Sequence, residues 1–471
     1  MRIGIIGAGP AGTVCALSLL RAERRLGPEH EVLLFDGKSF LQCGPMGCNM
    51  CAGVISESLL DRLAELGAKA PPTLIQRRLT GHYFQTRAGG IHLAGHPESP
   101  LCTVFRGVGP QDALPDIDHS FDQFLLQSAM AAGAVHHTAN VAEVVLPARP
   151  GGAFRLHTHG VRANTHGVRA NTYGVRANTH GVRERIAGGE VHEVDVVVGA
   201  FGVNSALARR FERLGFGYRR PATFHVCQAD LPLDAGFLDR TYGGEIKILS
   251  LGLPKIRFGA LTPKREHVTV TIIGQHLRRG DLERFLLHPQ VRRHFPRNWR
   301  LPRSYCHCHP LLPVTAARNP VTDRLLVIGD AHVSRYLKGG IESAFFTGSL
   351  AARMILAGRL TREELVQGYV GPCRARYVRD NAYGRLLFRC NDVISHVPLV
   401  TAAGLQLLER EQRLPDWQDR PHARILWRIF TGEAPYRTIA REALSPASAL
   451  TAAAALCRTV AGLVRPAGEE R

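Results

Sequence analysis

Three glycines near the start of the chain have the spacing that a dinucleotide-binding loop requires. They follow residues 2–6, an apolar stretch typical of a buried parallel strand, and precede a helical pattern over 11–22. The first glycine permits a tight turn, the second lets the backbone approach a pyrophosphate, and the third lets helix and strand pack closely. Free N–H groups at the start of the helix would then face the phosphates. The residues that we predict to contact the phosphates are Gly7, Gly9, Pro10, Ala11 and Gly12.

An acidic residue stands where such a site needs one. Residues 31–36 predict the second strand of a βαβ unit, and Asp36 lies at its end. A carboxylate at this position can accept hydrogen bonds from both hydroxyls of an adenosine ribose, and it would repel a 2′-phosphate. Asp36 therefore favours FAD or NAD over NADP.

A second set of candidate binding residues lies far downstream. The apolar run 325–328 predicts another buried strand, and it is followed by Gly329 and Asp330. Residues 339–341 place a glycine pair at the predicted start of a helix. A carboxylate at a strand end and an open helix N-terminus, combined with the N-terminal loop, predict FAD held at both of its ends rather than NAD.

These motifs resemble those of the flavoprotein superfamily of para-hydroxybenzoate hydroxylase, and within it most closely the geranylgeranyl reductase branch. The resemblance covers about residues 1–360. It implies that Gly329 and Asp330 bind the ribityl chain of FAD. It also implies that the following loop and helix start present backbone N–H groups to the pyrimidine ring, where a helix N-terminus stabilises the negative charge of reduced flavin. Lys338 could add a full charge there, and the N–H groups belong to Gly339, Gly340 and Ile341.

A cysteine-rich turn lies where the reductase branch places a Cys-Gly loop near the flavin. The resemblance implies that Cys43 and Gly44 contact the cofactor and that Cys43 borders the reaction site, so Cys43 and Lys338 are the candidate catalytic residues. The turn also has the cysteine spacing of plant-type [2Fe–2S] ferredoxins. A packing or redox thiol is the favoured interpretation, and we predict no metal. The alternative cluster would use Cys43, Cys48, Cys51, Cys306 and Cys308.

The predicted substrate region differs from the related reductases and halogenases. Residues 249–253 carry leucines where those families carry aromatic motifs. If these leucines line a pocket, it is an aliphatic one, which suits a prenyl or fatty chain better than a stacked aromatic ring.

The chain order predicts an α/β fold, α+β overall, with a discontinuous Rossmann-like FAD-binding domain formed by residues 1–215 and 316–358. An antiparallel sheet over 216–315 would form the inserted substrate domain, because the pattern there changes to alternating strands. Residues 359–471 predict a helical C-terminal region. A heptapeptide repeat over 160–187 predicts a loop insertion, since its units lack a second apolar position.

Composition limits the class of partner. The 471 residues carry a formal net charge of +19, which favours anionic partners, but no nucleic-acid-binding motif is present. The chain begins directly with a strand and contains 11 cysteines, so we expect a cytoplasmic protein with reduced thiols. The alanine-rich tail 444–464 predicts either a packing helix or peripheral contact with the inner face of a membrane.

The leading functional prediction is an FAD-dependent oxidoreductase, similar to geranylgeranyl reductases, that reduces C=C bonds of an isoprenoid or other lipid. NAD(P)H or another donor would supply the electrons, and the sequence does not identify it. The alternative is an FAD-dependent monooxygenase or halogenase, in which reduced flavin reacts with oxygen. A flavin-binding sensor or assembly protein without turnover is the third hypothesis.

Overall fold

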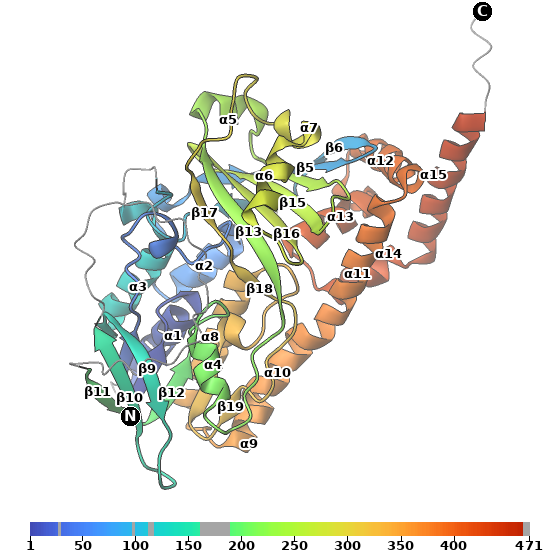
Figure 1. Ribbon diagram of the computed structural model, residues 1–471. Coiled ribbons are helices and arrows are strands. Elements are labelled where there is room, and N and C mark those ends of the chain that lie inside the picture. The colour runs from blue at the N-terminus through green and yellow to red at the C-terminus, as the bar shows by residue number, and fades with distance from the viewer. Residues whose placement is uncertain (27–29, 97–98, 112–116, 161–188, 465–471) are drawn as a thin grey trace, which may run out of the picture.

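A computed structural model describes residues 1–26, 30–96, 99–111, 117–160 and 189–464 (Figure 1). Within them the chain forms a parallel sheet with its helices, a second larger sheet, and a set of C-terminal helices. This arrangement confirms the α/β class with a separate antiparallel layer. The predicted repeat loop, 160–187, falls outside the described residues except for Gly160.

The first sheet brings together strands from distant parts of the sequence. Its central strand β1 pairs in parallel with β2 and β12, and β12 pairs in parallel with β20. The carboxyl ends of β1 and β20 therefore meet at one edge, where ligands bind in open α/β sheets. The strands in spatial order are β19 (Val321–Thr322), β20 (Leu325–Val327), β12 (Val196–Gly199), β1 (Arg2–Ile6), β2 (Glu31–Phe35) and β8 (Val135–His137).

Alternate residues of these strands contact opposite layers, as the two-residue period of a strand requires. Ile3 and Ile5 of β1 pack with the helices, whereas Ile6 packs with a small antiparallel sheet. The helices of this core are α1 (Pro10–Leu26), α3 (Phe121–Ala132) and α8 (Gly340–Leu356). The small sheet consists of β9 (Ala139–Val145), β10 (Phe154–Gly160) and β11 (Val191–Val194).

The second sheet is largely antiparallel, as predicted for 216–315, but it extends beyond that range. The hairpin at 81–94, which the sequence analysis places in the cofactor domain, joins its edge through a parallel pairing of β5 with β14. No local pattern indicates this pairing, because its partners are far apart in the sequence. The strands in spatial order are β17 (Cys306–Cys308), β13 (Thr223–Pro232), β16 (His267–Gly274), β15 (Ile256–Pro263), β14 (Glu245–Ser250), β5 (Gly81–Thr86) and β6 (Gly89–Ala94), with β18 (Leu311–Pro313) paired to β13.

The C-terminal helices cover one face of the second sheet, and Figure 1 shows them along its side in orange and red. Phe388, Trp427 and Phe430 pack against the strands there. The helices on this face are α11 (Arg379–Ser395), α12 (Pro398–Gln412), α13 (Pro421–Thr431) and α14 (Tyr436–Ala443), and α15 (Pro446–Val464) packs on α12. The preceding helices α9 (Arg362–Leu365) and α10 (Gly371–Cys373), with π-helical turns at 366–370 and 374–378, pack instead with the helical core of the first sheet.

Shorter elements complete the two halves. Helices α5 (Ala235–Thr241), α6 (Arg279–Leu287) and α7 (Pro289–Arg292) cover the other face of the second sheet. A small antiparallel sheet is formed by β3 (Val54–Ser56), β4 (Arg77–Leu79) and β7 (Leu101–Thr103). Two further helices are α2 (Glu57–Glu65) and α4 (Leu207–Glu212), and the 3₁₀ turns are η1 (Gly44–Met46), η2 (Pro72–Leu74), η3 (Ile117–His119), η4 (Gly329–Ala331) and η7 (Trp417–Asp419).

Among the described helices, none taken singly has the length and apolar composition of a membrane span. One pair, Tyr436–Ala443 with Pro446–Ala461, reaches that composition when joined, across a bend of 56°. In the structure Tyr436 and Ile439 of this pair are buried against the second sheet. Peripheral membrane contact through 444–464 stays a prediction.

Candidate functional site

The predicted phosphate-binding turn connects β1 to α1. Gly7 has a φ of 112°, and a Cβ on it would lie 2.5 Å from the carbonyl oxygen of Ala200. A Cβ on Gly12 would lie 1.9 Å from the carbonyl oxygen of Gly7, so glycine lets α1 start this close to β1. Gly9 differs because an added Cβ would meet no backbone atom: the nearest atom is the amide nitrogen of Asn49 at 3.5 Å, and Gly9 borders a cavity. The turn thus leaves open the space that a pyrophosphate needs.

Asp36 lies directly after β2 and beside this turn. Its Oδ2 accepts a hydrogen bond of 2.8 Å from the backbone N–H of Ala8, and its Oδ1 accepts one of 2.9 Å from the N–H of Lys38. Burial raises the pKa of this carboxyl, and the two N–H groups oppose the shift. Each carboxylate oxygen keeps a second lone pair, so the fixed side chain can still accept hydroxyl groups from the cavity.

Asp330 lies in η4, immediately after β20, and lines the same cavity. Its Oδ1 is buried and has no hydrogen-bond partner among the described residues. Burial raises the pKa of the carboxyl, while a hydrogen bond with Ser334 acts in the opposite direction. An unsatisfied buried oxygen costs about 1–3 kcal/mol. Oδ1 therefore has room for a donor such as a ligand hydroxyl.

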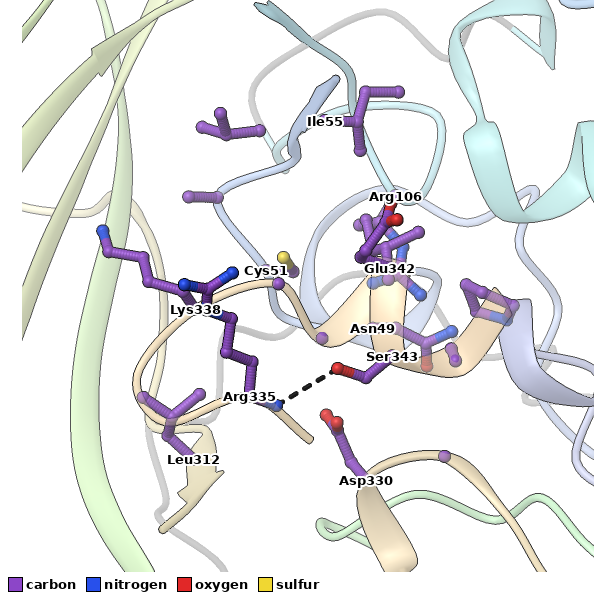
Figure 2. Close-up of a pocket in the computed structure, with 18 of the residues that line it drawn as sticks. Asn49, Cys51, Ile55, Arg106, Leu312, Asp330, Arg335, Lys338, Glu342 and Ser343 are labelled. Carbon is purple, nitrogen blue, oxygen red and sulfur yellow. Dashed lines mark hydrogen bonds between the residues drawn. The ribbon is translucent and has the colours of Figure 1, made fainter. Parts of the chain in front are cut away.

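The N-terminus of α8 opens next to Asp330. Gly339 precedes the helix in the left-handed conformation, with φ of 63° and ψ of 33°. A Cβ on Gly340 would lie 3.4 Å from Oδ2 of Asp330, so the helix start and the carboxylate border the same space. The hydroxyl oxygen of Ser343 accepts a 3.1 Å hydrogen bond from the N–H of Arg335, which ties the preceding loop to the first turn of α8 (Figure 2).

Packing between α1 and α8 fixes the two motifs relative to one another. A Cβ on Gly348 of α8 would lie 2.6 Å from the carbonyl oxygen of Ala11 in α1. Thr347 Oγ1 accepts a 3.0 Å hydrogen bond from the N–H of Gly329, next to Asp330. The two sequence motifs, distant in the chain, are therefore parts of one rigid site.

Residues of both sheets line a single cavity of about 1460 Å³. Most of the predicted cofactor-binding residues border it, whereas Gly12 acts in the packing beneath it. The predicted residues in its wall are Gly7, Gly9, Pro10, Ala11, Asp36, Gly329, Asp330, Lys338, Gly339, Gly340 and Ile341. Its apolar half is formed by Val226, Ile246, Ile248, Phe258, Ala260 and Ile273.

The leucines of 249–253 do not line this pocket, so the condition on which they would make it aliphatic is not met. Leu249 and Leu251 belong to the core on the opposite face of the second sheet, under α5 and α6. Ile246 and Ile248 of β14 face the cavity instead, because residues one position apart on a strand point to opposite faces. The aliphatic character expected of the pocket is present, but other residues supply it.

The cysteines do not occupy the places that the resemblance implies. Cys43 and Gly44 are absent from the cavity wall, and Cys51 is the cysteine that lines it. Gly44 lies instead against β17, where an added Cβ would be 3.6 Å from Sγ of Cys306. Among the described residues, one group of three metal-ligating side chains has its ligand atoms within 4.8 Å of each other, and it contains no cysteine: His137, Glu190 and His192.

A buried ion pair beside the cavity was not predicted. Arg106 donates two hydrogen bonds to Asp122, of 2.7 Å from Nε to Oδ1 and 2.9 Å from Nη2 to Oδ2. The two side chains are 7% and 0% exposed. Asn49 also donates to Asp122 and borders the cavity next to Gly9. Asp122 lies in the first turn of α3 and Arg106 on a loop before it, and no sequence motif indicates that the two side chains pair.

The side chain of Lys338 extends away from the N-terminus of α8. Figure 2 shows its side chain extending away from Asp330, toward the strands of the second sheet. The Nζ atom lies 5.5 Å from the ring centre of Phe258 in β15 and 5.3 Å from that of Phe430 in α13. Its amine therefore borders the apolar half of the cavity rather than the half that contains Asp330.

Comparison with known proteins supports the fold. No family model matches the chain, and no curated protein matches its sequence. A flavoprotein/dehydrogenase from Cytophaga hutchinsonii is 13% identical, with a TM-score of 0.61 over 98% of this chain and 100% of that one. The flavin-dependent brominase Bmp2 is 15% identical, with a TM-score of 0.59 over 94% and 98%. Aklavinone-11 hydroxylase, solved with FAD and aklavinone, is 15% identical, with a TM-score of 0.52 over 78% and 63%.

The likeness of these structures to this chain concerns the fold. The narrower resemblance to geranylgeranyl reductases stays a prediction. The chain has the fold of flavin-dependent oxidoreductases, halogenases and hydroxylases.

Proposed function

We propose that this protein is an FAD-dependent oxidoreductase that acts on a hydrophobic substrate in the cavity between its two sheets. The observation that carries the proposal is the buried Oδ1 of Asp330, which lacks a donor, next to the open N-terminus of α8. At the other end of the same cavity lie the open space at Gly9 and the fixed carboxylate of Asp36. An open helix N-terminus, an acceptor, a phosphate-binding turn and a second acceptor match the flavin ring, the ribityl chain, the pyrophosphate and the adenosine ribose of FAD.

Each of these residues has a defined task toward the cofactor. The turn from Gly7 to Gly12 and the start of α1 would hold the pyrophosphate, and Asp36 would accept the adenosine ribose hydroxyls. Asp330 would accept a ribityl hydroxyl, and the first N–H groups of α8 would contact the pyrimidine edge. Bound FAD supplies the redox chemistry, which the side chains of the cavity do not provide themselves.

The second sheet gives the substrate its environment. Ile246, Ile248 and Ile273 form an apolar wall, and the C-terminal helices close the cavity through Phe430. Such a wall excludes water from the space next to the cofactor and favours ligands with aliphatic parts.

Two chemistries fit this site. The reductase predicted from sequence would add hydrogen to a C=C bond, and the alternative would use oxygen for hydroxylation or halogenation. The brominase and the hydroxylase among the structural neighbours favour the oxygen-using alternative. An assay with FAD, NAD(P)H and candidate lipids distinguishes the two chemistries. It is run with and without oxygen and with and without bromide, and the masses of the products are measured by mass spectrometry. Oxygen uptake coupled to a hydroxylated or halogenated product supports the alternative, and a product two hydrogens heavier formed without oxygen supports the reductase.

Replacing Asp330 by asparagine should change FAD affinity and the stability of the FAD-free protein in opposite directions. The raised pKa means that the folded protein disfavours the ionised carboxylate, so at neutral pH this group destabilises the FAD-free chain. We expect Asp330→Asn to raise the free energy of unfolding of the FAD-free protein by about 1 kcal/mol while weakening FAD binding about tenfold. Urea unfolding and fluorescence titration measure the two effects. Unchanged FAD affinity would remove Asp330 from the site.

A further inference from the structure

One amine in the apolar half of the cavity has no counter-charge. Lys338 Nζ lies over the rings of Phe258 and Phe430, and no carboxylate pairs with it among the residues that the structure describes. A lysine amine in apolar surroundings is costly unless an anion or hydrogen-bond acceptor meets it. Because Lys338 lies in the cavity wall, a molecule bound in the cavity can supply this anion or acceptor.

A second unsatisfied polar group lies in the wall of the same cavity, and the charge of Lys338 acts on it. His82 of β5 is 2% exposed, lines the cavity and contacts the ring of Trp427 at 4.6 Å between ring centres. Its Nδ1 has no hydrogen-bond partner in the described chain. Burial, followed by the nearby charge of Lys338, lowers the pKa of His82 to about 3. The ring is therefore neutral at physiological pH and can donate one hydrogen bond to a ligand.

Neighbouring helices hold the loop that carries Lys338, and Arg335 on the same loop is a second positive charge that acts on the amine. Arg335, on the same loop, donates to the carbonyl oxygens of Gly432 and Ala434. The next residue, Tyr336, donates its N–H to Oδ1 of Asn381 at 2.8 Å. Helices α11 and α13 and the segment after α13 thus hold the loop, and the guanidinium of Arg335 is engaged by backbone carbonyls, whereas the amine of Lys338 borders the apolar half of the cavity.

We infer that Lys338 and His82 form the binding site for the carboxylate of an otherwise apolar substrate, an inference that rests on the proposed function for its place beside the cofactor. The amine would pair with one carboxylate oxygen, and the neutral imidazole would donate to the other. The aliphatic remainder of the substrate would lie along Ile246 and Ile248. A monoanion fits better than a phosphate dianion, because a second negative charge would have no partner in this apolar half.

The pH dependence of binding follows from the same groups. Burial, together with the charge of Arg335, lowers the pKa of Lys338 to about 8. The other titratable group that interacts with this amine is His82, which stays neutral in this range. The charged amine, present below pH 8, binds the carboxylate. We expect the dissociation constant of a carboxylate ligand to be constant from about pH 6 to 8 and to rise about tenfold per pH unit above 8.

Calorimetric titration with matched ten-carbon ligands tests the inference. Decanoate, its methyl ester and decanol share an aliphatic chain and differ in charge, and each is titrated into the protein with and without added FAD. We expect wild-type protein to bind decanoate about tenfold or more tightly than decanol or the ester. Lys338→Met should remove this preference and leave decanol affinity unchanged, Lys338→Arg should retain part of it, and His82→Leu should reduce it. Exposed Lys69→Met is the matched control and should change nothing.

Equal affinities for decanoate and decanol in the wild-type protein, or a preference that survives in Lys338→Met, would overturn the inference. Melting curves verify that each variant is folded, and the decanol titration verifies that its apolar wall is intact. If FAD fails to bind while decanoate is still preferred, the proposed function fails and the carboxylate site stands. If FAD binds but decanoate is not preferred over decanol, the carboxylate site is refuted and the proposed function stands.

Discussion

Replacing Gly12 by alanine should abolish FAD binding. An added Cβ would lie 1.9 Å from the carbonyl oxygen of Gly7, well inside van der Waals contact, so α1 must move away from β1. That movement displaces the helix N-terminus and the open space at Gly9, which together would hold the pyrophosphate in the proposed function. We expect FAD affinity to fall at least about a hundredfold and the free energy of unfolding to fall by about 1–3 kcal/mol.

Gly404→Ala provides the matched control for this substitution. Gly404 lies in α12, and nothing lies within 4 Å of an added Cβ. Alanine is the better helix former by about 0.5–1 kcal/mol, so this variant should be as stable as the wild type or more so, with normal FAD affinity. If Gly12→Ala binds FAD as the wild type does, the turn after β1 is not the phosphate site. Fluorescence titration and urea unfolding measure both variants.

Removing the guanidinium of Arg106 should have the largest effect on stability. Asp122 is fully buried, and Arg106 supplies its two charge-assisted hydrogen bonds. Arg106→Met would leave the Asp122 carboxylate buried with the amide of Asn49 but without a counter-charge. Breaking a buried pair from one side costs about 3–5 kcal/mol. FAD affinity should also fall, because Asn49 lies next to Gly9 in the cavity wall.

The double variant Arg106→Met with Asp122→Leu tests whether the unpaired charge is the cause. Removing both charges should restore a large part of the lost stability, since the buried carboxylate is then gone. Arg78→Met serves as the surface control. Its side chain is 66% exposed and pairs with Glu57, so we expect a loss below about 1 kcal/mol. A loss of similar size in Arg78→Met and Arg106→Met would contradict the buried-pair account. Urea unfolding measures all three.

The cofactor half of the site could be predicted from the sequence because its signals are local. The glycine spacing, the strands around it and Asp36 lie within the first 36 residues. The second stretch, Gly329 to Ile341, is also short and combines an acidic residue after a strand with a glycine pair at a helix start. In each case the residue type follows from a requirement of the backbone: a tight turn, the close approach of a helix to a strand, or an open helix N-terminus. The structure places both stretches on one cavity.

The apolar half of the cavity depends on long-range strand pairing, which local patterns do not reveal. The leucines of 249–253 and Ile248 are neighbours in the sequence, and a shift of one residue decides which of them faces the cavity. The hairpin at 81–94, which carries His82, joins the second sheet through β14, far along the chain. Arg106 and Lys338 acquire their surroundings only when loops from different parts of the chain meet.

The visible absorption spectrum of the purified protein during titration with FAD tests the central claim most directly. The account predicts a yellow protein with bands near about 370 and 450 nm, the positions of a flavin chromophore. It further predicts uptake of one FAD per chain, weakened in Asp330→Asn and absent in Gly12→Ala. A colourless wild-type protein that takes up no FAD would contradict the account.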